Sequence, residues 1–200
     1  MSSQTLLIAT SNKHKLGEIR DFLKGVPWRI VGLDEFPACE APDETGDTFE
    51  KNAIIKASAY CERFGVACVA DDSGIVIDAL HGEPGVLSAR YAAPNATDED
   101  NNKKVLRALE GVPDALRSAR FICCCALVVP GNAPHIETGT VEGHIAHAIT
   151  GANGFGYDPL FIPDGYKETF GVLSPAIKAA ISHRAKAFRK LRVHLDPSAA

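Results

Sequence analysis

An apolar run that stops at two adjacent acids constrains the fold of this chain more than any other feature. Residues 66–70 read Val-Ala-Cys-Val-Ala, and Asp71, Asp72, Ser73 and Gly74 follow directly. A short apolar run bounded by turn-forming residues is typical of a strand buried on both faces of a sheet. Ligand sites of α/β proteins favour the carboxyl ends of such strands. We therefore expect a buried strand that ends at the two aspartates and presents them to a ligand.

The sequence on either side of this run predicts an α/β fold with a mixed sheet. A strand at residues 5–9, a helix at 13–24 and a strand at 28–33 form an α/β opening. Two long β stretches, at 118–129 and 136–149, follow one another directly and indicate a hairpin. The remaining expected elements are helices over 49–64 and 97–110, a strand at 75–80 and a helix at the C-terminus.

The size and charge of the chain restrict the classes of protein that it can be. With 200 residues, 46% of them hydrophobic, the chain is expected to form one globular domain over residues 1–200. The net charge of -4 and the lack of a long basic block argue against binding of a nucleic-acid polymer. The apolar run at 6–9 is too short for a signal peptide or a membrane span. We expect a cytoplasmic protein that binds no membrane.

The cysteines offer an alternative reading as a zinc or redox site, which their spacing does not favour. No two of them form a CxxC pair, and adjacent strand residues face opposite sides of a sheet, so three consecutive cysteines cannot bind one ion from a regular strand. We expect buried, reduced thiols. The six cysteines are Cys39, Cys61, Cys68, Cys123, Cys124 and Cys125.

A candidate phosphate-binding loop lies at the first strand-to-helix turn, with the sequence Thr10-Ser11-Asn12-Lys13-His14-Lys15. Hydroxyls, an amide and two lysines can hold phosphate oxygens together with backbone N–H groups and the helix dipole. The glycines of a Walker A loop are missing, so this segment is not a P-loop. The alternative is a helix N-cap whose lysines face solvent.

Asp71 and Asp72 are candidates for a metal site. Two neighbouring carboxylates repel each other unless a cation or another positive group relieves the repulsion. Mg²⁺ fits because it takes carboxylate oxygens, keeps waters and is completed by substrate phosphates. Glu44 lies in the acidic loop before the helix at 49–64 and can supply another oxygen. The alternative is an Asx turn that ends the strand.

A glycine-rich segment that carries two aromatic residues and an acid is a candidate base-binding loop. It covers residues 151–159 and includes Phe155, Tyr157 and Asp158. Glycines let the backbone approach a ligand, an aromatic face can stack on a base, and a carboxylate can accept hydrogen bonds from its N–H groups. A hairpin loop without a ligand explains the glycines equally well.

Lys178, His183 and Arg184 form the last candidate group. Around one continuous helix these side chains would point in different directions. If Ser182 caps a new helix, His183 and Arg184 fall in its first turn, where backbone donors also favour anions. The alternative is the start of a surface helix.

Six segments in this order resemble the Ham1/RdgB family of inosine triphosphate pyrophosphatases. The resemblance implies a two-lobed α/β fold with a mixed central sheet flanked by helices and a nucleotide cleft between the lobes. It also implies hydrolysis of noncanonical purine nucleoside triphosphates, such as ITP, dITP and XTP, to the monophosphate and pyrophosphate, with Mg²⁺ as cofactor and a homodimer as the assembly. The segments are TSNKHK, DETGDTFEKNA, ADDSG, GVLSARYA, GFGYDPLF and ISHRAKA.

The resemblance also implies roles for individual residues. Asp72 matches the general base and metal ligand of the family, and Glu44, Lys56 and Asp71 match supporting positions. We expect Asp72 and Glu44 to bind the metal ion. One departure lies at residues 173–177, which read Leu-Ser-Pro-Ala-Ile where the family usually has acidic residues. The implied substrate contacts are Thr10, Ser11, Asn12, Lys13, His14, Lys15, Lys56, Ser73, Phe155, Gly156, Tyr157, Asp158, Lys178, His183 and Arg184.

Two other functions remain open on the sequence. A related pyrophosphatase could act on other modified nucleotides. A nucleotide-binding regulatory module without turnover would have no need of Asp71 and Asp72 as a metal pair.

Overall fold

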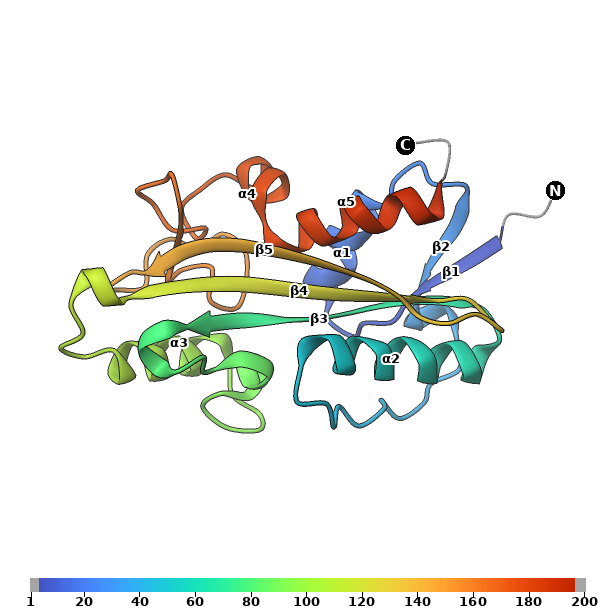
Figure 1. The fold of residues 1–200 in the computed structure, drawn as a ribbon, viewed down its shortest axis with the longest axis horizontal. Coiled ribbons are helices and arrows are strands. Elements are labelled where there is room, and N and C mark those ends of the chain that lie inside the picture. Colours follow the sequence, from blue (N-terminus) through green and yellow to red (C-terminus); the bar gives the residue numbers. More distant parts are fainter. Residues whose placement is uncertain (1–3, 197–200) are drawn as a thin grey trace. The chain divides into compact units, whose positions relative to one another are not determined.

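The computed structural model describes residues 4–196, which form a mixed α/β fold around a six-stranded sheet (Figure 1). The strands are ordered β2-β1-β3-β4-β5-β6. β1 pairs in parallel with both β2 and β3, whereas β5 and β6 are antiparallel, so the prediction of a mixed sheet is confirmed. The strands are β1 (Gln4–Ile8), β2 (Trp28–Gly32), β3 (Ala67–Ile77), β4 (Ser118–Val128), β5 (His135–Ile145) and β6 (Phe161–Pro163).

The helices begin and end close to the positions that the sequence predicts. Thr97 caps the third helix through a reciprocal capping box with Asp100. The predicted break near the C-terminus is confirmed, because Ser182 has an extended backbone between the last two helices. The helices are α1 (Lys13–Phe22), α2 (Phe49–Phe64), α3 (Asp98–Ala108), α4 (Pro175–Ile181) and α5 (His183–Leu195). Within residues 4–196, none of the helices has the length and apolar character that a bilayer crossing requires.

The predicted end of a strand at Asp71 and the predicted second strand at 75–80 are wrong, because β3 is one strand of 11 residues that runs through both aspartates. Residues 78–80 form a short 3-10 turn instead. The strand can continue through Asp71 and Asp72 because side chains alternate between the two faces of a sheet, which places the two carboxylates on opposite faces. Each then finds its own cationic partner, as described below.

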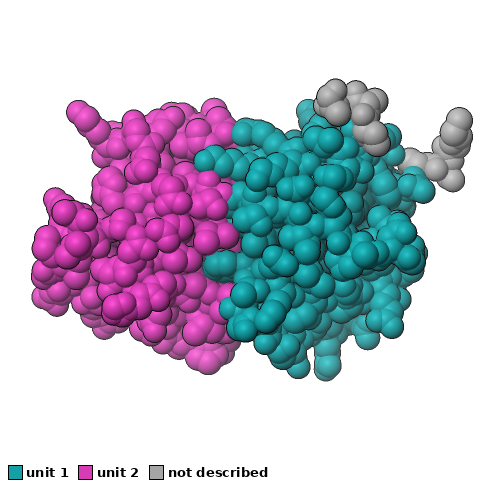
Figure 2. Space-filling model, in the orientation of Figure 1, with its two compact units in different colours: residues 1–72, 123–139, 184–200 teal, residues 73–122, 140–183 magenta. Residues whose placement is uncertain are grey.

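Contacts divide the chain into two compact units, which Figure 2 colours separately. Unit 1 is drawn from residues 1–72, 123–139 and 184–200, and unit 2 from residues 73–122 and 140–183. Each unit has its own hydrophobic core. Because both units are assembled from separate stretches of the chain, the single domain over residues 1–200 stays a prediction.

The core of unit 1 lies between its strands and the helices α1 and α5, while α2 covers the other face of these strands (Figure 1). Phe188, Leu191 and Leu195, the predicted apolar stripe of α5, are buried in this core. Cys123 and Cys125 face the same core, and the neighbouring Cys124 lies near Thr138. All six cysteines are free and all but the half-buried Cys39 are buried, so the predicted burial of the three consecutive cysteines is confirmed.

The core of unit 2 is built around aromatic side chains. Phe121 and Phe161 lie with ring centroids 4.7 Å apart, and Phe170 is 5.6 Å from Phe161. α3 adds Val105 to the same cluster, which also includes Tyr157 of the predicted base-binding loop. The loop is therefore anchored in the core of its own unit.

Gly74 allows a close approach of the backbone in unit 2. A Cβ atom at this position would lie 2.2 Å from the Ser88 hydroxyl oxygen and 2.7 Å from the Gly85 carbonyl oxygen. Gly74→Ala is therefore expected to lower the free energy of unfolding by about 1–3 kcal/mol. Denaturant unfolding measures the change.

Gly17 provides the matched control, because it lies in α1 and a Cβ atom there would meet nothing within 4 Å. Gly17→Ala is expected to raise the free energy of unfolding by about 0.5–1 kcal/mol. Equal effects of the two substitutions would contradict the close approach at Gly74.

Candidate functional site

Asp71 and Asp72 lie on opposite faces of β3 and have different partners. The Asp71 carboxylate is 3.1 Å from the Lys15 ammonium on α1. The Asp72 carboxylate accepts a hydrogen bond of 3.2 Å from the Asn52 amide on α2. The expectation that positive groups relieve the repulsion of the pair is thus confirmed, with Lys15 and Arg184 beside Asp71 and Lys56 beside Asp72.

Asp71 belongs to a buried network of ion pairs. Its side chain is 0% exposed, and the Arg184 guanidinium, 1% exposed, donates to it at 3.2 Å. Arg184 also binds Glu18 of α1 at 2.6 Å. Burial alone would raise the pKa of Asp71, but the charges of Lys15 and Arg184 outweigh it and hold that pKa well below the ordinary value of a carboxyl. Asp71 therefore stays ionised and ties α1 and α5 to β3.

Asp72 belongs to a second, more accessible group with Lys56 and Glu44. The Lys56 ammonium donates to Asp72 at 3.1 Å and to Glu44 at 3.0 Å. Burial raises the pKa of Asp72, the Lys56 charge opposes this, and the charge of Glu44 adds to the rise, so the net shift is upward. Burial lowers the pKa of Lys56, but the surrounding carboxylates outweigh it and the net shift is again upward. The carboxylates of Asp72 and Glu44 thus both contact the Lys56 ammonium.

The predicted phosphate-binding loop caps α1 and places one lysine in the Asp71 network. The Asn12 side chain accepts from the backbone N–H groups of His14 and Lys15, as an N-cap does. Thr10 accepts from the Asn12 N–H group. Lys15 points to Asp71, whereas Ser11, Lys13 and His14 are exposed at the helix start. The loop therefore combines exposed donors with a helix N-terminus, which can bind an anion.

In unit 2, Asp158 and Lys178 form a buried ion pair beside Phe155. The Lys178 ammonium lies 2.6 Å from the Asp158 carboxylate and 4.5 Å from the centre of the Phe155 ring. The same Asp158 oxygen accepts a hydrogen bond from the Phe155 N–H group. Gly154 has a φ of 76°, and a Cβ atom there would lie 1.9 Å from Asp158. Glycine is thus required for this turn, and the three predicted site residues lie together despite the departure at residues 173–177.

Tyr157 and Phe155 differ in burial and in the contacts that they make in the loop. Tyr157 is buried, and its hydroxyl donates to the Ser88 carbonyl at 2.8 Å. Only Phe155 of the two aromatics is partly exposed, so the predicted stacking on a base stays a prediction for Phe155 alone. Tyr157 instead anchors the loop.

The remaining predicted residues lie at the ends of elements. His183 is buried and its ring stacks on Phe121, with centroids 4.7 Å apart. Ser73 is a half-buried residue of β3. Arg184 contacts Asp71 and Glu18, and its predicted contact with a nucleotide stays a prediction.

The structure adds residues to the candidate site that are not among those predicted from the sequence. Asn52 binds Asp72, and Glu18 binds Arg184. On α3, Asp98 accepts from the Gly156 N–H group and Asn102 donates to its carbonyl oxygen. The spacing of Asn52 and Lys56 on one helix face was a usable signal, since such residues are neighbours on a helix. No local signal links the others to their distant partners.

The chain is similar in sequence and in fold to proteins of one family. The model of the Ham1 family matches residues 6–194. A dITP/XTP pyrophosphatase of Nocardia farcinica is 47% identical over 194 residues, which is 96% of this chain and 94% of that protein. The Ham1 protein of Staphylococcus aureus has a TM-score of 0.88 at 36% identity, covering 98% of this chain and 100% of that one. A HAM1 protein of Coxiella burnetii has a TM-score of 0.87 at 42% identity, with the same coverage.

The Asp71 network predicts a large loss of stability when its central charge is removed. Asp71→Asn leaves Lys15 and Arg184 without their shared carboxylate and is expected to cost about 3–5 kcal/mol of unfolding free energy at neutral pH. Because the pKa of Asp71 is lowered by folding, its contribution is present above the unfolded pKa of about 4 and declines as the pH falls below it. Denaturant unfolding at several pH values measures this loss.

The control is Asp47→Asn, which removes an exposed ion pair with Lys51. This substitution is expected to leave the unfolding midpoint close to that of the wild type. A difference between wild type and Asp71→Asn that is small, or that grows as the pH falls, would contradict the role of the network.

Proposed function

Because the chain belongs to the Ham1 family, we propose that it hydrolyses noncanonical purine nucleoside triphosphates, such as ITP, dITP and XTP, to the monophosphate and pyrophosphate. The observation that carries the proposal is the group of Asp72, Glu44 and Lys56, in which two carboxylates meet one ammonium. Removal of such nucleotides from the pool keeps them out of DNA and RNA. We place this activity in a cytoplasmic homodimer, as the family resemblance implies.

Mg²⁺ is the cofactor that this group fits best. Glu44 and Asp72 offer oxygen ligands, and both already direct an oxygen at the same positive charge. Burial is the main cause of the raised pKa of Asp72 and the Glu44 charge adds to it, so a cation bound here would favour the ionised carboxylate. Asp72 and Glu44 would hold the ion. When bound, it supplies positive charge that stabilises the phosphate oxygens.

In the proposed reaction Asp72 accepts a proton from a water molecule and orients the water toward the α-phosphorus. The new bond joins the water oxygen to the α-phosphorus, the bond from the α-phosphorus to the α–β bridging oxygen breaks, and pyrophosphate leaves. Asn52 donates to one Asp72 oxygen and Lys56 to the other, so both hold the carboxylate in place. Lys13, Lys15 and Lys56 supply positive charge for the leaving pyrophosphate, the main contribution a protein makes to phosphoryl transfer.

The Phe155, Asp158 and Lys178 group in unit 2 is proposed to bind the base. Phe155 offers an aromatic face, and the buried Asp158–Lys178 pair offers an acceptor and a donor. A keto purine accepts a hydrogen bond where adenine carries an amino group. His183 or a backbone N–H group can supply that donor. Adenine would leave the donor unpaired, which disfavours its binding.

Asp72→Asn tests the assignment of the base. The amide keeps the shape of the side chain but accepts a proton poorly, so turnover is expected to fall by about 10²–10⁴-fold while nucleotide binding weakens only modestly. Pyrophosphate release and a binding titration with ITP measure the two quantities. Asp34→Asn, an exposed acid, is the control and should leave turnover unchanged. Near-normal turnover of Asp72→Asn would rule out the assignment.

A nucleotide panel tests the function itself. With Mg²⁺ present, ITP, dITP and XTP are expected to release pyrophosphate with kcat/KM at least about 100-fold above that for ATP. The product assay must distinguish pyrophosphate from orthophosphate. Equal kcat/KM values for ITP and ATP would contradict the proposed selectivity. Tight binding without pyrophosphate release would indicate a regulatory module, and a preference for modified pyrimidines would indicate a different pyrophosphatase.

A further inference from the structure

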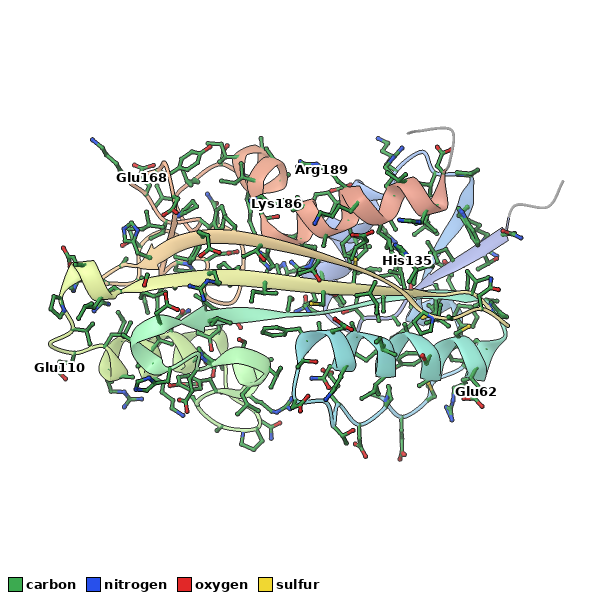
Figure 3. The ribbon with its side chains drawn as sticks, in the orientation of Figure 1. Glu62, Glu110, His135, Glu168, Lys186 and Arg189 are labelled. Carbon is green, nitrogen blue, oxygen red and sulfur yellow. The ribbon has the colours of Figure 1, made fainter. Side chains whose placement is uncertain are left out.

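A second cluster of metal-binding side chains lies in unit 1, away from the groups assigned to nucleotide chemistry. It consists of His135 and Glu137 on β5 and His194 in the last turn of α5. His135 and Glu137 are alternate residues of one strand, so both point to the same side. Figure 3 labels His135 on the part of β5 that lies beside α5.

Two distances within this cluster match those between the ligands of one small ion, whereas the two imidazole rings, with centroids 3.6 Å apart, would have to turn apart for both to bind it. The Glu137 carboxylate oxygen lies 3.1 Å from Nε2 of His135 and 3.4 Å from Nε2 of His194. A tetrahedral Zn²⁺ ion with bonds of about 2.0–2.1 Å places its ligand atoms roughly 3.3 Å apart. We propose that His135, Glu137 and His194 bind a divalent transition-metal ion, and that Zn²⁺ is the ion this site fits best.

The ligand set selects a different class of metal from the Asp72 group. Imidazole nitrogens suit Zn²⁺ and its transition-metal neighbours, whereas Mg²⁺ prefers oxygen ligands in an octahedral arrangement. Asp72 and Glu44 offer oxygen alone, while this cluster offers two nitrogens and one carboxylate. The three side chains are 38%, 22% and 44% exposed, so an ion can enter from solvent and keep a water as its fourth ligand.

A bound ion would link β5 to α5 and so stabilise unit 1. These elements are already joined by the Lys190 ammonium, which donates to the Thr138 carbonyl oxygen at 2.7 Å. α5 also carries Arg184, the partner of Asp71, but the positions of Arg184 and His194 in the helix place them about 15 Å apart along its axis. The ion is therefore structural, and it takes no direct part in nucleotide hydrolysis.

Hydrogen bonds from both imidazoles to the same Glu137 oxygen would give similar contacts without an ion, so the test must detect the ion itself. The full-length protein without an affinity tag is stripped with a chelator and titrated with Co²⁺, which has visible absorption bands that Zn²⁺ lacks. We expect one Co²⁺ per chain with bands typical of imidazole in tetrahedral coordination, and loss of these bands when Zn²⁺ is added. Absence of the bands in the wild type would overturn the proposal.

Matched variants locate the ion. His194→Gln and Glu137→Gln are expected to weaken Co²⁺ binding at least about tenfold, while His144→Gln, an exposed histidine of the same strand, leaves it unchanged. Bands that survive in His194→Gln but vanish in Glu44→Gln would place the ion in the Asp72 group and overturn the proposal.

Thermal stability gives a second readout, which does not depend on the visible absorption of Co²⁺. Zn²⁺ is expected to raise the Tm of the wild type and of His144→Gln, because an ion that binds only the folded chain stabilises it. The Tm of His194→Gln should not respond, although circular dichroism of the metal-free protein should show that this variant is folded. An equal rise in Tm for His194→Gln would contradict the site.

Discussion

Side chains of β3 point alternately to its two faces, and this alternation decides what the two adjacent acids can do. Asp71 turns toward α1 and α5, where Lys15 and Arg184 neutralise it. Asp72 turns toward α2, where Asn52 and Lys56 hold it. The strand can therefore pass through two charged residues without a break. One acid becomes part of the framework, and the other stays available for chemistry.

The buried charges of unit 1 form a connected network because each would be costly alone. A buried ion pair stabilises a protein only when the geometry is good and the remaining hydrogen-bonding groups are satisfied. Arg184 contacts two carboxylates, Glu18 and Asp71, and Asp71 contacts two cations, Lys15 and Arg184. The network holds the start of α1, and with it the candidate phosphate-binding loop, against β3. The proposed metal site would act on the other end of α5.

The candidate base-binding loop of unit 2 is held in place by contacts within the protein that do not require a bound ligand. Tyr157 fastens it to the core, and Asp158 is bound by Lys178 and by the backbone of its own turn. Contacts from α3 to Gly156 add two further hydrogen bonds. Such a loop loses little conformational freedom when a ligand binds, so less of the binding energy is spent on ordering it.

The sequence by itself determined the features that depend on neighbours in the chain. The length of α2, the cap at Thr97 and the break at Ser182 follow from helical periodicity and capping residues. It also marked Asp72, Lys56 and Glu44 as candidates, because their residue types and family resemblance did not need contacts to be known. Only the tertiary structure decided which distant groups meet, since periodicity gives the face of an element but not what packs on it. The features that only the tertiary structure decided are the partners of Asp71, the burial of Tyr157, the hydrogen bonds from α3 to Gly156, and the cluster of His135, Glu137 and His194.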